Sequence, residues 1–144
     1  MTHIEIIQAT PALADELVKI ENACFTMPWS RQSLIESLQN ECSHFYVALA
    51  DGVAVGYIGV QIFSGEGYVT NVAVLPPYRR QGIARALIKR AMENELAFLT
   101  LEVRESNTPA IQLYASLGFE PVGKRPRFYR EPEEDAVLMT KTFV

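Results

Sequence analysis

The stretch from Tyr68 to Glu93 holds the clearest group of residues suited to bind an anion. A β-branched run and a double-proline turn lead to Gly82, and the apolar periodicity that follows predicts a helix. Because the first turn of a helix has no internal partners for its backbone N–H groups, such a turn attracts phosphates. No acidic residue lies between Glu66 and Glu93, whereas the basic residues there are Arg79, Arg80, Arg85, Lys89 and Arg90. The stretch therefore predicts a pyrophosphate site.

These residues also have a purely structural interpretation, in which Gly82 relieves a tight turn and the arginines form a solvated face. The stretch is not a Walker A motif, because no Lys-Ser/Thr pair follows the glycine at the required spacing. It is not a G-x-G-x-x-G dinucleotide fingerprint either. A single glycine at the start of a helix is a weak signal alone, so the other motifs must decide between a phosphate site and a purely structural turn.

Glu102 lies in the middle of an apolar strand predicted over residues 98–104. Alternation puts Glu102 on one face with Thr100 and Arg104, and the opposite face carries Leu99, Leu101 and Val103. A carboxylate in such a strand is costly unless it is paired or used in chemistry. The alternatives to a chemical role are an ion pair with Arg104 and a surface charge at the end of the strand.

Tyr114 belongs to a helical pattern whose buried face consists of Ala110, Leu113, Tyr114 and Leu117. The simplest interpretation is a tyrosine in the hydrophobic core. A buried tyrosine still needs a hydrogen-bond partner for its hydroxyl, however, so a role at a ligand site stays open.

The whole sequence has the composition of a globular protein, 49% hydrophobic and 21% charged. Its 144 residues predict a single domain, 1–144, that buries roughly two-thirds of its unfolded surface. The net charge of −4 argues against a nucleic-acid-binding protein. Cys24 and Cys42 are too few for a disulfide framework and lack metal-ligand spacing, so we expect no metal. No run is apolar enough to span a membrane, and Met1–Ile4 lacks targeting features, so we expect a cytoplasmic protein.

Period-two and period-3.6 patterns predict the elements that position these residues. Four helices are predicted. The first begins at the Thr10-Pro11 cap and runs to about Phe25, and the second is capped by Ser30. The third follows Gly82, and the fourth begins at Thr108 and ends at Gly118. An irregular arginine-rich loop is expected over 125–134. The predicted strands cover residues 3–8, 45–49, 53–62, 69–75, 98–104, 119–124 and 136–143. Strands that are first antiparallel and later separated by helices predict a mixed sheet covered by helices, an α/β or α+β fold.

Several motifs together resemble the GCN5-related N-acetyltransferases (GNAT). Arg79-x-x-Gly82-x-Ala84 after a Val-rich strand matches the acyl-CoA signature of that family, in which the last position is Gly or Ala. Downstream, the resemblance is to RimI-type ribosomal-protein alanine N-acetyltransferases, and it lies in Leu101-Glu102-Val103-Arg104-x-Ser106-Asn107 and Ala110-Ile111-x-Leu113-Tyr114-x-x-Leu117-Gly118-Phe119. Pro28-Trp29-Ser30 and Arg127-Phe128-Tyr129 extend it over most of the chain.

The resemblance implies a mixed, splayed sheet of about seven strands flanked by about four helices. Acetyl-CoA would lie between the strands at 69–75 and 98–104, with its pantetheine arm along Val72, Ala73 and Val74. The residues that would wrap its pyrophosphate are Arg79, Arg80, Gln81, Gly82, Ile83 and Ala84. Asn107 would also contact CoA, although it is equally interpreted as a polar residue just ahead of the helix cap.

The resemblance also implies acetyl transfer by direct attack in a ternary complex. Glu102 would be the general base, directly or through a water, and Tyr114 the general acid for the CoA sulfur. A backbone N–H group near Val72 to Val74 would stabilise the oxyanion. Trp29 and Phe128-Tyr129 would flank the amine site, with a hydrophobic plug between the first two helices as the alternative for Trp29.

The acceptor that the resemblance implies is the N-terminal alanine of ribosomal protein S18. The alternatives are other protein N-termini, a small-molecule amine, and a non-catalytic module that only binds acyl-CoA. The sequence predicts no direct contact with nucleic acid and no particular oligomeric state.

Overall fold

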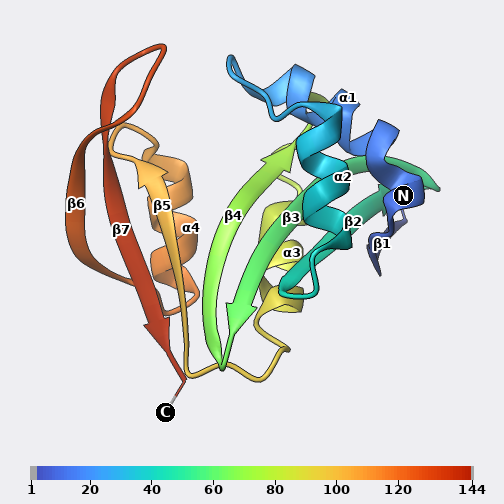
Figure 1. The fold of residues 1–144 in the computed structure, drawn as a ribbon. Helices are drawn as coiled ribbons and strands as arrows, with labels where there is room; N and C mark the ends of the chain where they lie inside the picture. Colours follow the sequence, from blue (N-terminus) through green and yellow to red (C-terminus); the bar gives the residue numbers. More distant parts are fainter. Residues whose placement is uncertain (1–2, 144) are drawn as a thin grey trace.

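The computed structural model describes residues 3–143, so Met1 and Thr2, which belong to the N-terminal segment considered above, lie outside the described part. Seven strands form one sheet in the order β1-β2-β3-β4-β5-β7-β6 (Figure 1). Their bounds are β1 Ile4–Gln8, β2 Ser43–Ala50, β3 Val53–Phe63, β4 Glu66–Val74, β5 Phe98–Arg104, β6 Glu120–Tyr129 and β7 Glu134–Thr142. Neighbouring strands pair antiparallel except β4 and β5, which are parallel. The predicted mixed sheet is confirmed.

Helices cover both faces of this sheet. They are η1 Pro11–Leu13, α1 Ala14–Cys24, α2 Arg31–Gln39, η2 Pro76–Tyr78, α3 Ile83–Ala91 and α4 Thr108–Ser116. The larger core lies where α3 and α4 pack on the sheet, with Ile88 and Leu99 among its fully buried residues. The smaller core lies under α1 and α2, around Leu17, Leu34 and Tyr57. Within residues 3–143, no helix is long and apolar enough to cross a membrane.

The sheet opens between its two parallel strands. β4 and β5 pair only through Glu66–Tyr68 and Phe98–Thr100, and Figure 1 shows them meeting at one end and diverging at the other. The β3–β4 register shifts just beyond this point, where Gly59 pairs with Asn71 and Val60 with Val69, so that Thr70 is left without a partner. Because such a bulge bends and twists a strand, it turns β4 away from β5. The splay that the family resemblance implied is therefore present.

The late part of the chain differs from the expectation of an irregular loop over 125–134. Strand β6 continues to Tyr129, and only residues 130–133 separate it from β7. The arginine-rich sequence suggested a loop, and in the structure almost every residue of β6 is exposed. An edge strand tolerates exposed basic residues and Pro126, since one of its sides needs no hydrogen-bond partner.

The predicted caps are correct in part. Ser30 caps α2 by accepting a hydrogen bond from the Ser33 backbone N–H at 3.1 Å, and Gly118 follows α4 with a φ of 98°. Thr10 makes no side-chain cap, because the chain first forms the short η1 turn before α1 begins. Asp51 and Gly52 form the hairpin turn between β2 and β3, both with positive φ.

Candidate active site

A cavity of about 630 Å³ lies where β4 and β5 diverge. Its walls come from the end of α1 and the connection to α2, from β4, β5 and α4, and from the turn between β6 and β7. Four of the predicted catalytic and cofactor residues line it, namely Val72, Glu102, Asn107 and Tyr114. Ala73, Val74 and the loop Arg79–Ala84 do not line it, so the predicted cofactor residues extend beyond this cavity.

Glu102 and Tyr114 reach the cavity from opposite sides of β5. Burial alternates along this strand as predicted, and Leu101 and Val103 face the core that Tyr114 of α4 also joins. Glu102 points to the other face, with 27% of its side chain exposed and the Arg125 Nε 3.8 Å from its carboxylate. In a continuous sheet β5 would separate Glu102 from Tyr114. Because β4 diverges from β5 here, both side chains line the same cavity.

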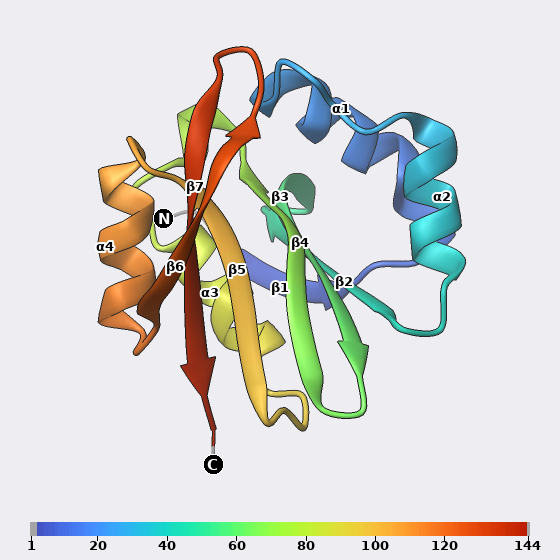
Figure 2. The same cartoon turned by 60° about the vertical axis from the view of Figure 1, so that its left-hand side comes forward.

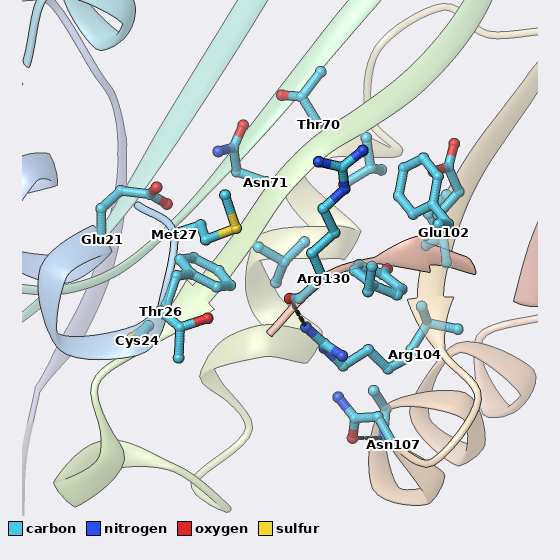
Figure 3. A pocket seen from close by; sticks show the side chains of 18 of the residues that line it. Glu21, Cys24, Thr26, Met27, Thr70, Asn71, Glu102, Arg104, Asn107 and Arg130 are labelled. Atoms are coloured by element: carbon cyan, nitrogen blue, oxygen red, sulfur yellow. Dashed lines mark hydrogen bonds between the residues drawn. The ribbon is translucent and has the colours of Figure 1, made fainter. Parts of the chain in front are cut away.

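The predicted alternative of an ion pair between Glu102 and Arg104 is wrong, because Arg104 binds the β6–β7 turn. Its guanidinium donates hydrogen bonds to the carbonyl oxygens of Arg130 at 3.2 Å and Pro132 at 2.9 Å. It also pairs with the Glu134 carboxylate at 3.2 Å and lies 4.5 Å from the centre of the Tyr129 ring. Arg104 therefore holds the β6–β7 turn in place, and this turn forms one wall of the cavity (Figure 3).

Replacing Arg104 with Gln should lower the free energy of unfolding by about 1–3 kcal/mol, since two carbonyls and a carboxylate lose a charged donor. Urea denaturation followed by circular dichroism measures this change. The matched control is Arg127→Gln, because Arg127 is 82% exposed and pairs only with Glu133 at 3.5 Å in the described chain. Equal stability of the two variants would contradict the role given to Arg104.

The Tyr114 hydroxyl makes no hydrogen bond to another residue within 3–143, although the side chain is 7% exposed. Its ring packs against Phe119 with centroids 5.9 Å apart. Burial raises the pKa of Tyr114 to about 12, so the hydroxyl stays protonated near neutral pH. A protonated hydroxyl that lines the cavity and has no partner within residues 3–143 can donate to a group that enters the cavity.

Asn107 is the N-cap of α4, since its Oδ1 accepts a hydrogen bond from the Ala110 backbone N–H at 3.3 Å. Thr108, which the sequence suggested as the start of the cap, is the first helical residue. Asn107 also lines the cavity. The sequence placed Asn107 just ahead of the helix cap, whereas Asn107 is the cap itself. The CoA contact implied by the resemblance stays a prediction.

The predicted pyrophosphate loop has the backbone features of an anion site. Gly82 precedes α3 with a φ of 81°, and no side chain caps the helix. A Cβ built on Gly82 would have no neighbour within 4 Å, which leaves open space above the helix start. One N–H group of Arg79 is already engaged, because its Nε donates to the Val74 carbonyl at 2.8 Å. This hydrogen bond fixes the end of β4. The arrangement fits a phosphate group at the free N–H groups of α3.

The sequence reasoning did not identify Glu21 and Asn71, the two buried polar residues of the cavity wall. Glu21 stands in the apolar stripe of α1 beside Leu17 and Ile20, and this unusual position was the available signal. Asn71 is 7% exposed, and its Oδ1 has no hydrogen-bond partner among residues 3–143.

Aromatic residues named from the sequence line the cavity. Trp29 packs against the smaller core and also lines the cavity, while its place beside the amine site stays a prediction. Tyr129 lines the opposite wall, and burial, followed by the negative charge of Glu102, raises its pKa to about 12. The two walls meet where the Thr26 hydroxyl donates to the Glu131 carbonyl at 3.1 Å, and Figure 2 shows the β6–β7 turn beside the α1–α2 connection.

These features fit acyl-CoA as a ligand. Within residues 3–143, the edge of β4 that faces β5 has no strand partner beyond Tyr68, and exposed backbone groups can pair with an extended pantetheine arm. The α3 N-terminus would hold the pyrophosphate, and Tyr114 offers a donor near the cavity. No cluster of metal-ligating side chains occurs within residues 3–143.

Comparison with known proteins supports the same ligand class. The Acetyltransferase (GNAT) family matches residues 14–119. A Bacillus subtilis (strain 168) protein, provisionally named a ribosomal protein bS18-alanine N-acetyltransferase, is 38% identical over 133 residues, which are 89% of this chain and 88% of that protein. The crystal structure of the ribosomal-protein-S18-alanine N-acetyltransferase from Escherichia coli superposes with a TM-score of 0.90 at 30% identity, covering 97% of this chain and 94% of the other.

The fold also matches a structure determined with acetyl-CoA bound. Arabidopsis thaliana NAA60 in complex with acetyl-CoA has a TM-score of 0.87 at 18% identity, over 98% of this chain and 99% of that one. The splayed sheet, the cavity at its opening and the matched sequence agree on one conclusion: the chain belongs to the GNAT family of acetyltransferases.

Proposed function

We propose that this protein transfers an acetyl group from acetyl-CoA to the N-terminal α-amine of a protein, with the N-terminal alanine of ribosomal protein S18 as its acceptor. The relatives from B. subtilis and E. coli carry that activity in their names. The observation that carries the proposal is the splay, because the carboxylate of Glu102 and the side chain of Tyr114 both line the cavity at its opening.

In the proposed mechanism the acceptor enters between the α1–α2 connection and the β6–β7 turn. Glu102 takes a proton from the α-amine, directly or through a water, as the nitrogen attacks the thioester carbon. The backbone N–H groups of β4 near Val72 to Val74 stabilise the negative charge on the carbonyl oxygen. Tyr114 gives its proton to the departing sulfur as the C–S bond breaks. The C–N bond forms in this same ternary complex.

An α-amine suits a single, partly buried base. Its pKa is about 8 and that of lysine about 10.4, so near neutral pH the α-amine is neutral roughly a few hundred times more often. A protonated α-amine therefore loses its proton to a base such as Glu102 more easily than a protonated lysine does. The lower pKa favours protein N-termini over lysine side chains as acceptors.

The cofactor contacts proposed from the sequence follow the same geometry. The pantetheine arm would lie along Val72, Ala73 and Val74, and Arg79–Ala84 would hold the pyrophosphate. The Nε of Arg79 is engaged with Val74, so its remaining N–H groups would face the phosphates. We place the reaction in a single domain and in the cytoplasm.

The test is an acetylation assay with acetyl-CoA and synthetic peptides, read by mass spectrometry of the modified position. A peptide with the N-terminal sequence of ribosomal protein S18 should be acetylated on its α-amine, and the same peptide with a blocked N-terminus should not react. Matched peptides that begin with Ser, Gly or Met measure the preference for alanine. Acetylation confined to lysine or to a small amine would overturn the proposal.

A further inference from the structure

Glu21 is a buried carboxylate in the cavity wall that the mechanism above does not use. It lies in α1 and is 1% exposed, and no lysine, arginine or histidine within residues 3–143 forms an ion pair with it. A buried carboxylate without a cation is costly, so its hydrogen bonds must compensate. Figure 3 shows Glu21 and Glu102 on opposite sides of the cavity.

The two carboxylate oxygens of Glu21 bind two different parts of the chain. Oε1 accepts a hydrogen bond from the Trp29 backbone N–H at 2.7 Å, and Oε2 accepts one from the Tyr57 hydroxyl of β3. Burial and then the charge of Glu21 raise the pKa of Tyr57, so its hydroxyl remains a donor. The carboxylate thus ties the α1–α2 connection to the sheet.

Glu21 holds both ends of the segment 25–29. Its backbone carbonyl accepts from the Phe25 N–H at 3.0 Å, while its side chain holds the Trp29 N–H. The segment is neither helix nor strand, so few other backbone hydrogen bonds define its shape. The members of the segment that line the cavity are Phe25, Thr26, Met27 and Trp29.

We propose that Glu21 is a positioning residue that fixes segment 25–29 as the acceptor-facing wall of the cavity. It acts through the backbone of Trp29 and does not touch the reacting atoms. The inference rests on the proposed function, since it assigns a role in binding the acceptor. It implies that Glu21 governs the KM for the peptide, whereas acetyl-CoA, which lies along β4 and the start of α3, is bound independently.

Glu21→Gln tests this role because the amide has the same shape but only one accepting oxygen. Its NH2 group must face either the Trp29 N–H or the Tyr57 hydroxyl, so at least one contact is impaired. We expect the KM for the peptide to rise about 10-fold or more, as for a lost charge-assisted hydrogen bond. The kcat should change less than about threefold and the Kd for acetyl-CoA should stay the same, since neither depends on segment 25–29 in this scheme.

Trp29 is the only tryptophan, so its fluorescence reports the segment directly. The emission maximum of Glu21→Gln should move toward longer wavelength as the wall loosens. Glu16→Gln is the matched control, because Glu16 lies on the same helix and its side chain is 42% exposed. It should leave both the peptide KM and the emission unchanged.

Tyr57→Phe is a second variant in case Glu21→Gln does not fold. It removes one donor and leaves the bond to Trp29 in place, so the peptide KM should rise by a smaller factor. A folded Glu21→Gln or Tyr57→Phe protein with an unchanged peptide KM would overturn the proposal, and so would a loss confined to kcat. If the wild-type protein acetylates no peptide, the proposed function fails, while Trp29 emission still tests the positioning role.

Discussion

Glu102→Gln should lower kcat for peptide acetylation by roughly 10²–10⁴-fold, the usual contribution of a general base. The amide keeps the shape of the side chain but cannot take a proton from the acceptor amine. Acetyl-CoA should bind the variant with the same Kd, because its predicted contacts lie on β4, Asn107 and the start of α3. Initial rates at saturating peptide and calorimetric titration with acetyl-CoA measure the two quantities.

The matched control for this variant is Glu105→Gln. Glu105 follows β5, is 48% exposed and pairs with Lys124 at 2.7 Å, but does not line the cavity. Its replacement should leave kcat unchanged. A Glu102→Gln enzyme with full kcat would remove this residue from the mechanism. Wild-type protein that binds acetyl-CoA but turns over no amine would favour the non-catalytic module.

Tyr114→Phe should lower kcat by about 10–100-fold, less than the change at Glu102. A thiol has a pKa of about 8.5, so a thiolate leaves more easily than an amine does. The general acid Tyr114 therefore contributes less to the rate than the general base Glu102. Phe keeps the ring against Phe119, and the missing hydroxyl has no partner within residues 3–143. The melting temperature should therefore stay within a few degrees of the wild type, which separates a chemical role from a packing role.

The control for Tyr114→Phe is Tyr68→Phe. Tyr68 is 38% exposed, and its hydroxyl donates to Glu66 at 3.1 Å, away from the cavity lining. Its variant should be fully active. Unchanged kcat in Tyr114→Phe would show that another donor, or water, protonates the sulfur. Tyr129, also on the cavity wall, would then be the next residue to replace.

Local patterns in the sequence were sufficient for most elements. Period-two alternation predicted which face of β5 carries Glu102, and the turn before Ile83 predicted the free end of α3, because both depend on neighbours a few residues apart. Pairing between strands that are distant in sequence was harder to predict. The first half of β6 was predicted as a strand, but its continuation to Tyr129 was not, since this exposed, basic sequence has no buried face and only pairing with β7 defines it.

Partner choice among polar residues also required the structure. Arg104 is two residues from Glu102, yet it binds the β6–β7 turn, because its long side chain finds carbonyls and a carboxylate there. Glu21 is eight residues from Trp29 and 36 from Tyr57, and only the folding of α1 onto β3 brings the three together. Sequence spacing limits which residues share a face, but it does not select among distant partners.

By itself the sequence determined the order of most elements, the face of β5 on which Glu102 lies and the family signature. The tertiary structure decided where β4 and β5 separate, and hence that Glu102 and Tyr114 line a single cavity. The physical reason is that strand separation depends on hydrogen bonds between distant segments and on the bulge at Thr70. Side-chain periodicity is the same in a strand whether its neighbour is paired or absent.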